Sequence, residues 1–186
     1  AGGADNQSAF QACINYCVTN QRAMFIPQGT WNCNSGLSIT GKIKIFGEGR
    51  YMSLVQFTGT SVTGFTVNTA SAVEFHSMWI YGVTPGASNC GISLTGTGSG
   101  NFGSVFRDVV FDAFYDPFIT LSAYGWTMEN CAFNNWTHNA VAVANALSMD
   151  SGDSTITHCL FSNAGASARC VFQSSSGGLW IINCKM

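Results

Sequence analysis

The sequence predicts an all-β fold: a right-handed single-stranded parallel β-helix with a short capping α-helix at its N-terminus. Two observations predict the solenoid, namely a six-residue phrase that recurs five times and a period-two alternation of apolar residues around each copy. An amphipathic segment ahead of the first copy predicts the cap. We therefore divide the chain into a cap with a helix at residues 1–21 and β-helix rungs at residues 22–186, which we expect to be a section of a longer solenoid.

The recurring phrase keeps one chemical pattern through all its copies. The copies are FHSMWI (75–80), FRDVVF (106–111), MENCAF (128–133), ITHCLF (156–161) and IINCKM (181–186). Equivalent residues of successive copies are 22 to 31 residues apart, and a variable period of this size is typical of solenoids in which each repeat forms one rung. Stacked rungs should place Phe111, Phe133 and Phe161 in one column inside a narrow core.

The third residue of each copy is interpreted as a corner. Apolar residues alternate on both sides of it, but the phase shifts by one residue, as in Phe75 followed by Met78. A corner that points into the core buries backbone amides, which a short polar side chain can bond. Asp108, Asn130 and Asn183 fit this requirement.

A second alternating series precedes each corner and supplies another strand for every rung. Its members are residues 64–67, 91–94, 117–120, 140–143 and 170–173. Loops rich in Gly, Ser and Thr, of unequal length, separate these strands from the recurring phrase. We expect a triangular cross-section in which three short strands per rung build three parallel sheets.

The N-terminal segment has the pattern of an amphipathic helix. Asp5 and Asn6 are suitable caps for a helix that runs to about Asn20. Its apolar stripe consists of Phe10, Cys13, Ile14, Cys17 and Val18. Because an open β-helix end exposes apolar core and unpaired strand edges, we expect this stripe to cover that end.

The segments after this helix, MFIPQGTW (24–31) and LSITGKIKIFGEGR (37–50), resemble the N-terminal portion of the pectate-lyase-like superfamily, which includes tailspikes and depolymerases of tailed bacteriophages. In that superfamily a helix caps the first coil, a Pro-x-Gly-Thr turn follows the first strand and an Ile-x-Gly-x-Gly turn opens the next rung. The resemblance implies a polysaccharide as partner, a homotrimer, and a place in the virion tail after assembly in the host cytoplasm, with secretion as the alternative.

The resemblance carries over no catalytic residue. The Asp-pair and Gly-His-Gly motifs of polygalacturonases are not found in this sequence, and neither are the calcium-binding acids and basic catalyst of pectate lyases. Fold alone does not imply function. We therefore look for catalytic residues among the side chains that successive rungs bring next to each other.

Composition narrows the classes of partner. The net charge is −2 and the seven Lys and Arg residues are scattered, which gives no basic stripe for nucleic acid. No apolar run reaches 18 residues, so we expect no membrane partner. Only 9% of the residues are charged, and this low share favours coverage of part of the outer wall by further subunits.

Eight cysteines allow two interpretations. Cys131, Cys159 and Cys184 share one inward position, where a free thiol acts as a small apolar side chain. The even count also permits the disulfide framework of a secreted protein. We expect reduced core thiols. No CxxC or Cys-His spacing indicates zinc, so we expect no metal and no cofactor.

Outward positions on neighbouring rungs supply the candidate catalytic residues. If the first residue of each copy points inward, then His76, Arg107 and Glu129 point outward in one file, with Glu74 beside His76. Glu129 could act as general acid or base, Arg107 could hold a substrate carboxylate or sulfate, and His76 could shuttle a proton. A cross-strand salt bridge on a solvated sheet is the alternative.

Exposed aromatic residues and further acids supply candidate substrate-binding residues. Trp79, Tyr81 and Trp180 are at predicted outward positions, where their rings could stack on sugars or contact another subunit. Asp112 is a second acid near a corner and, with Glu74, completes the predicted binding set. Asp116 precedes a proline, which favours a turn residue.

The sequence thus predicts a phage tailspike-like module that binds and depolymerises a bacterial surface polysaccharide as a hydrolase or a lyase. A non-catalytic receptor-binding or structural spike module is the alternative. Whether the chain is an enzyme stays open at this point.

Overall fold

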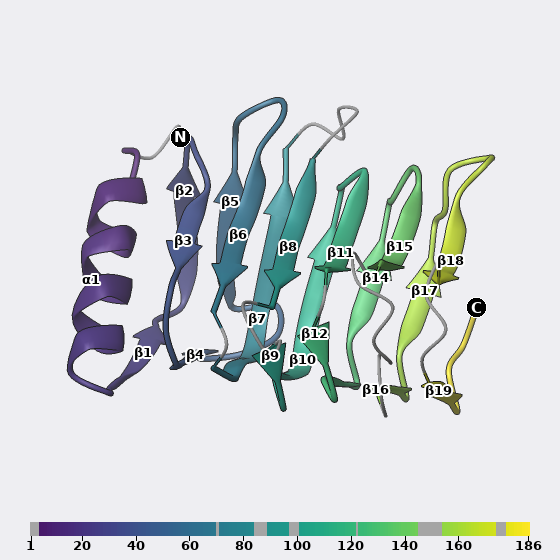
Figure 1. The fold of residues 1–186 in the computed structure, drawn as a ribbon. Helices are drawn as coiled ribbons and strands as arrows, with labels where there is room; N and C mark the ends of the chain where they lie inside the picture. The colour runs from purple at the N-terminus through teal and green to yellow at the C-terminus, as the bar shows by residue number, and fades with distance from the viewer. Residues whose placement is uncertain are drawn as a thin grey trace.

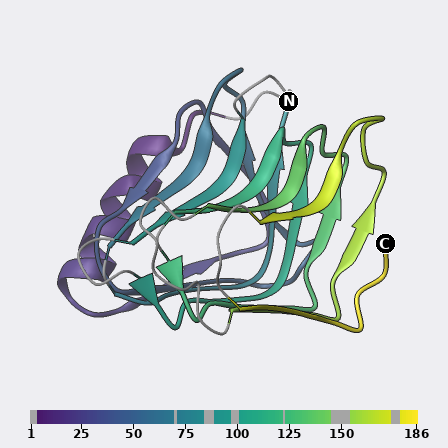
Figure 2. The ribbon, with the colours of Figure 1, turned by 45° about the vertical axis from the view of Figure 1, so that its right-hand side comes forward.

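A computed structural model describes residues 4–69, 71–83, 89–96, 101–121, 123–144, 154–173 and 178–186. Within these residues the chain is a parallel β-helix, with α1 (Gln7–Thr19) at one end and the strands stacked as rungs along a single axis (Figures 1 and 2). The predicted fold class is confirmed. Every pairing between neighbouring strands is parallel, and each strand pairs with its equivalent one rung along.

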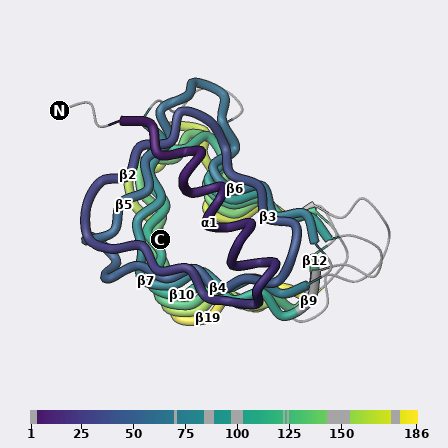
Figure 3. The backbone as a smooth tube through the Cα atoms, turned by 90° about the vertical axis from the view of Figure 1, so that its left-hand side faces the viewer, coloured from purple at the N-terminus to yellow at the C-terminus, as the bar shows by residue number. Residues whose placement is uncertain are grey.

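Three faces surround the core, as the end-on view shows (Figure 3). The first face consists of β1 (Ala23–Ile26), β4 (Ile43–Gly47), β7 (Val73–Gly82), β10 (Val105–Asp112), β13 (Thr127–Glu129), β16 (Ser154–Thr157) and β19 (Leu179–Ile182). The second face consists of β2 (Gly29–Cys33), β5 (Ser53–Phe57), β14 (Ala132–Asn134), β17 (Leu160–Ser162) and the C-terminal halves of β7 and β10. Since β7 and β10 run through the corner, these two faces form one continuous sheet.

The third face is a separate sheet. It consists of β3 (Leu37–Ile39), β6 (Thr63–Asn68), β8 (Cys90–Thr95), β11 (Asp116–Leu121), β15 (Asn139–Ala144) and β18 (Arg169–Gln173). These strands coincide with the second alternating series of the sequence. A short pair, β9 (Asn101–Phe102) and β12 (Ala123–Tyr124), forms outside the three faces.

Like residues stack on like residues in the core. Phe111, Phe133 and Phe161 pair in register, and their rings lie parallel with centroids 5.0 and 4.9 Å apart. Offset-stacked rings at this spacing gain attraction beyond the burial of apolar surface. The predicted column is confirmed, and with it the register of the second face.

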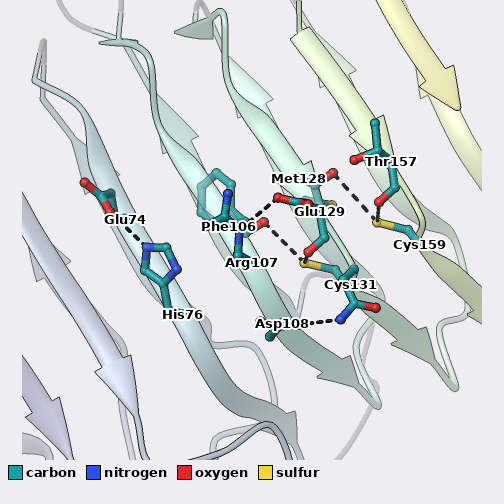
Figure 4. A network of polar contacts seen from close by, with 11 residues as sticks. Glu74, His76, Phe106, Arg107, Asp108, Met128, Glu129, Cys131, Thr157 and Cys159 are labelled. Carbon is teal, nitrogen blue, oxygen red and sulfur yellow. Dashed lines mark hydrogen bonds and ion pairs between the residues drawn. The ribbon is translucent and has the colours of Figure 1, made fainter.

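The corner residues differ from the expectation. The five corner residues, Ser77, Asp108, Asn130, His158 and Asn183, all have left-handed backbones with φ between 52° and 56°. Their side chains are partly or fully exposed, so the expected inward-pointing corner is wrong. A left-handed residue breaks the strand alternation and turns the chain, and Asn and Asp tolerate this conformation better than most residues. Between neighbouring corners, Asn130 donates a side-chain hydrogen bond to Asp108 (Figure 4).

Helix α1 lies across the open end of the core (Figure 3). Phe10, Ile14 and Cys17 are buried against the first rung, as the apolar stripe predicted. Of the two expected caps, only Asp5 bonds the first turn, through a hydrogen bond from the Gln7 amide to Oδ1 at 3.0 Å. Within the described residues, no helix is both long and apolar enough to cross a bilayer.

The cysteine column is also present. All eight cysteines are free thiols in the structure, and Cys131 and Cys159 are buried while Cys184 is partly exposed. The thiol of Cys131 lies 3.6 Å from the carbonyl of Phe106, and that of Cys159 lies 3.9 Å from the carbonyl of Met128 (Figure 4). Each thiol lies closer still to a carbonyl of its own rung, Cys131 to Glu129 at 3.5 Å and Cys159 to Thr157 at 3.3 Å.

Replacing Phe133 with Ala should remove the middle ring of the stack and destabilise the fold by about 3–5 kcal/mol. Thermal denaturation should show a melting temperature roughly 10 °C lower. Tyr16→Ala, at a helix position 63% exposed, is the control and should change stability little. An unchanged melting temperature in Phe133→Ala would show that the core register is wrong.

The left-handed corner predicts an unusual order of substitutions at Asn130. Both Asn130→Ala and Asn130→Gly lose the hydrogen bond to Asp108, but only alanine is strained at φ 52°, by about 1–2 kcal/mol. Urea unfolding should therefore find the glycine variant more stable than the alanine variant. The opposite order would be incompatible with a left-handed corner.

Thiol labelling should separate the cysteines by burial. Burial raises the pKa of Cys33 to about 12 and that of Cys131 well above its ordinary value, so neither forms the reactive thiolate at neutral pH. In the native protein Cys33 and Cys131 should react with iodoacetamide only after denaturation, whereas the partly exposed Cys184 should react sooner. The hydrogen bond with Cys131 lowers the pKa of the Cys159 thiol, so burial alone protects that residue. Mass spectrometry that finds Cys131 or Cys159 in a disulfide would refute the thiol core.

Candidate functional site

Five charged or titratable side chains form a strip across the outer surface of the first face. Lys44 on β4 pairs with Glu74 on β7, and His76 on β7 pairs with Arg107 on β10, which pairs with Glu129 on β13. All five alternate with buried residues and therefore point outward. We call these five residues the ionic strip, and Figure 4 labels Glu74, His76, Arg107 and Glu129 among them. The structure thus brings His76, Arg107 and Glu129 together as the sequence register predicted.

Glu74 is the most heavily bonded carboxylate of the ionic strip. Its Oε2 accepts a hydrogen bond from Nε2 of His76 at 2.9 Å and lies 3.2 Å from Nζ of Lys44. The hydrogen bond from His76, together with Lys44, lowers the pKa of the Glu74 carboxyl below its ordinary value. Glu74 is therefore an anion at neutral pH, and Nε2 of His76 carries the proton between them.

Arg107 and Glu129 form the second ion pair of the ionic strip. Nε of Arg107 donates to Oε2 of Glu129 at 2.8 Å, and their side chains are 52% and 39% exposed. An exposed pair of this kind contributes only about 0.2–1 kcal/mol to stability. The contact uses Nε alone, so the two terminal nitrogens of the guanidinium stay outside this ion pair. They can hold an anionic group of a ligand beside Glu129.

Glu74 and Glu129, the two carboxylates of the ionic strip, are not neighbours in register. They are two rungs apart and offset by two residues along the strand. Each contacts a cation, Glu74 with Lys44 and Glu129 with Arg107. The arrangement therefore offers an acid-base group with a neighbouring cation.

Two of the three predicted aromatic residues, Trp79 and Tyr81, lie beyond the corner on the second face. Trp79 and Tyr81 are on the C-terminal half of β7, and the exposed ring of Tyr51 packs edge-on against Trp79 with centroids 5.8 Å apart. Nε1 of Trp79 is buried without a hydrogen-bond partner among the described residues. Trp180 lies apart from this group, on β19 of the first face, with its ring 61% exposed.

Asp112 is less accessible than a binding residue should be. Its side chain is only 8% exposed. Oδ1 of Asp112 accepts a hydrogen bond from Nδ2 of Asn135 at 2.7 Å, and Asn135 is a second left-handed residue, at the end of the second face. These contacts favour a role for Asp112 in holding that turn.

The sequence reasoning missed a second acid-base pair, at the start of the third face. Nδ1 of His138 lies 2.9 Å from Oδ1 of Asp116, and the ring of His138 stacks on Tyr115 at 4.6 Å. The amide of Asn139 also donates to Asp116, at 2.9 Å. Asp116 is the first residue of β11 and not the turn residue that the sequence predicted, and it orients an imidazole that is 49% exposed. Unequal loop lengths hid this register, because no repeated phrase marks the turn.

The described residues contain no cluster of three or more His, Cys, Asp or Glu side chains that could hold a metal ion. The ionic strip on the first face offers two carboxylates, an imidazole and two cations.

Comparison with known proteins shows the fold. No protein-family model matches the chain, and no curated protein matches its sequence. Similar solved structures include a proposed glycosyl hydrolase from Parabacteroides merdae, with 13% identity, a TM-score of 0.50, and a match that covers 98% of this chain and 91% of that one.

Two other similar structures are larger than this chain. The catalytic unit of the thermostable GH87 α-1,3-glucanase from Streptomyces thermodiastaticus is 18% identical, with a TM-score of 0.46, over 92% of this chain and 40% of that one. The Agl-KA catalytic domain is 16% identical, with a TM-score of 0.42, over 97% of this chain and 46% of that one. This chain thus spans less than half the length of these two proteins.

The lowered pKa of Glu74 predicts a pH-dependent contribution to stability. A carboxylate whose pKa is lower in the folded state stabilises the fold above its ordinary pKa and loses this effect as the pH falls through the lowered value. Glu74→Gln should therefore lower the melting temperature most at neutral pH, and the difference from wild type should shrink as the pH falls below the ordinary pKa of a glutamate and through the lowered value. A difference that does not change across this acidic range would mean that Glu74 is free of His76 and Lys44.

Proposed function

We propose that this chain is a carbohydrate-active β-helix module that binds an anionic polysaccharide along the ionic strip and depolymerises it. The observation that carries the proposal is the strip itself. His76, Arg107 and Glu129 lie side by side on three paired strands, and strands hold side chains more rigidly than loops, as a preorganised site requires. A polymer can lie along such a wall and meet each rung in turn.

The chemistry that fits this arrangement is elimination with one base and one cation. The terminal nitrogens of Arg107 bind the carboxylate of a uronate residue, which makes the proton on the adjacent carbon more acidic. Glu129 removes that proton as general base. The electron pair forms a carbon–carbon double bond as the glycosidic carbon–oxygen bond breaks, and the leaving oxygen takes a proton from water. The pairing of Glu129 with a cation, and not with a second acid, favours this route over two-carboxylate hydrolysis.

The aromatic residues of the second face extend the same proposal. Tyr51, Trp79 and Tyr81 form edge-on pairs just beyond the corner from His76. Aromatic rings of this kind offer apolar faces for the C–H surfaces of sugars and polar edges for their hydroxyls. Glycan units that pass over the corner would stack on these rings.

We further propose that the module works as part of a homotrimeric bacteriophage tailspike that acts on a bacterial surface polysaccharide. Two observations support this setting: only 9% of the residues are charged, and Phe25 and Trp180 are each at least half exposed. Apolar wall that is covered by neighbouring subunits would explain both. Sedimentation equilibrium should then give three times the mass of the chain, and a monomer at micromolar concentration would exclude the trimer.

A non-catalytic receptor-binding module is the second candidate. One observation favours it: both carboxylates of the ionic strip already contact a cation, Glu74 with Lys44 and Glu129 with Arg107. Such paired charges suit a wall that recognises a glycan without cleaving it. Incubation with capsular and pectic polysaccharides separates the two candidates. Shortened chains, with ultraviolet absorbance from unsaturated uronates, indicate a lyase, whereas retention without shortening indicates a binding module.

Glu129→Gln tests the catalytic assignment. The position is partly exposed, so the amide should leave the fold intact, but loss of the general base should lower the cleavage rate at least about 100-fold. Glu48→Gln, the same change at an exposed carboxylate outside the ionic strip, should cleave at the wild-type rate. Undiminished cleavage by Glu129→Gln would exclude the strip as the active site.

A further inference from the structure

A surface cavity of about 610 Å³ opens beside the ionic strip, at the end of the solenoid that α1 covers. Its wall comes from three segments that are far apart in the sequence. They are the end of α1 with the residues after it, up to Ala23, the turn into β4 at residues 41–44, and the start of β7 at residues 71–74. The volume is within the range of about 300–1,000 Å³ that is typical of pockets for small ligands.

Most of the charged side chains in the wall of this cavity are basic. Arg22, Lys42 and Lys44 all line it, whereas Glu74 is the single acid in its wall. Three of the seven Lys and Arg residues of the chain thus meet in one place, although the whole chain has a net charge of −2. Since Glu74 already accepts contacts from Lys44 and His76, it leaves Arg22 and Lys42 without a carboxylate partner in the cavity wall. The cavity therefore attracts anions.

The C-terminal end of α1 does not cancel this attraction. A helix C-terminus carries partial negative charge on its unbonded carbonyls. Here the carbonyls of Tyr16, Cys17 and Val18 accept backbone hydrogen bonds from the amides of Asn20, Arg22 and Gln21, at 3.0, 2.8 and 3.4 Å respectively. The chain that follows the helix thus satisfies these acceptors, and the positive side chains beside them face the cavity.

We infer that the cavity is a subsite for an acidic sugar residue, one that carries a carboxylate or a sulfate group. This inference rests on the proposed function, because Lys44 and Glu74 belong both to the cavity wall and to the ionic strip. A glycan anchored in the cavity by Arg22 and Lys42 therefore continues onto the strip without leaving the surface. The subsite selects acidic over neutral chains and sets the register in which units reach Arg107 and Glu129.

Binding of short oligosaccharides, measured by isothermal titration calorimetry, tests the subsite. The probes are trigalacturonate, a sulfated trisaccharide and neutral maltotriose, each with wild type, the double variant Arg22→Gln/Lys42→Gln and the control Lys185→Gln. Lys185 is exposed and lies outside the cavity wall. We expect at least one anionic probe to bind wild type and Lys185→Gln equally. The double variant should bind it roughly tenfold more weakly, as the loss of two exposed ion pairs predicts.

Each outcome has one consequence. A preference for the carboxylate or for the sulfate probe identifies the group that the subsite takes, and weakening of that binding by added salt supports the ionic contact. Equal affinities of wild type and double variant, or equal binding of maltotriose, overturn the inference, and so does the absence of binding by both anionic probes.

Binding and cleavage measurements together distinguish failure of the subsite from failure of the proposed catalysis. If wild type cleaves no polysaccharide but the double variant still loses affinity for an acidic trisaccharide, catalysis is refuted and the subsite stands. If wild type cleaves and the double variant cleaves with unchanged kcat and KM, the subsite is refuted and the active site stands. A raised KM with unchanged kcat supports both, because Arg22 and Lys42 hold substrate away from the reacting bond.

Discussion

In-register parallel pairing is the constraint on which the rest of this structure depends. Every strand pairs with its equivalent one rung along. Residues at equivalent positions of successive rungs therefore lie next to each other. On the inside this register produces the parallel rings of Phe111, Phe133 and Phe161. On the outside it sets Arg107 against Glu129. Core packing and the charged wall are therefore two consequences of one alignment, and a shift of a single residue would abolish both.

The repeats predicted the register but not every turn. The column of Phe133 could be derived because equivalent apolar residues recur in each copy of one phrase. The left-handed backbone at Asn130 could not, because polar residues suit both an inward corner that bonds amides and an outward corner with positive φ. The pair of Asp116 and His138 was missed for another reason. It lies at a turn between strands of unequal spacing, where sequence separation does not reveal which residues stack.

The side chains on the outer surface contribute less to stability than those in the core, so their placement is easier to interpret in terms of function. The Arg107–Glu129 pair of the ionic strip is too exposed to contribute much to folding, so its alignment on rigid strands is not explained by stability alone. Solenoid walls of this kind present a long, regular surface, and function comes from the side chains placed on it. Here the cavity and the ionic strip share Lys44 and Glu74, and Trp79 lies beyond the corner on β7, the strand that also carries His76. This order suits an extended anionic chain better than a compact ligand.

Carbodiimide footprinting of carboxylates, with and without the polysaccharide that binds most tightly in the panel, tests most directly whether glycan lies on the first face. Glu74 and Glu129 are both partly exposed on that face, whereas Glu48 is exposed outside the strip. We expect bound polysaccharide to protect Glu74 and Glu129 from modification and to leave Glu48 unchanged. Protection confined to other carboxylates, such as Asp116 on the third face, would contradict the account.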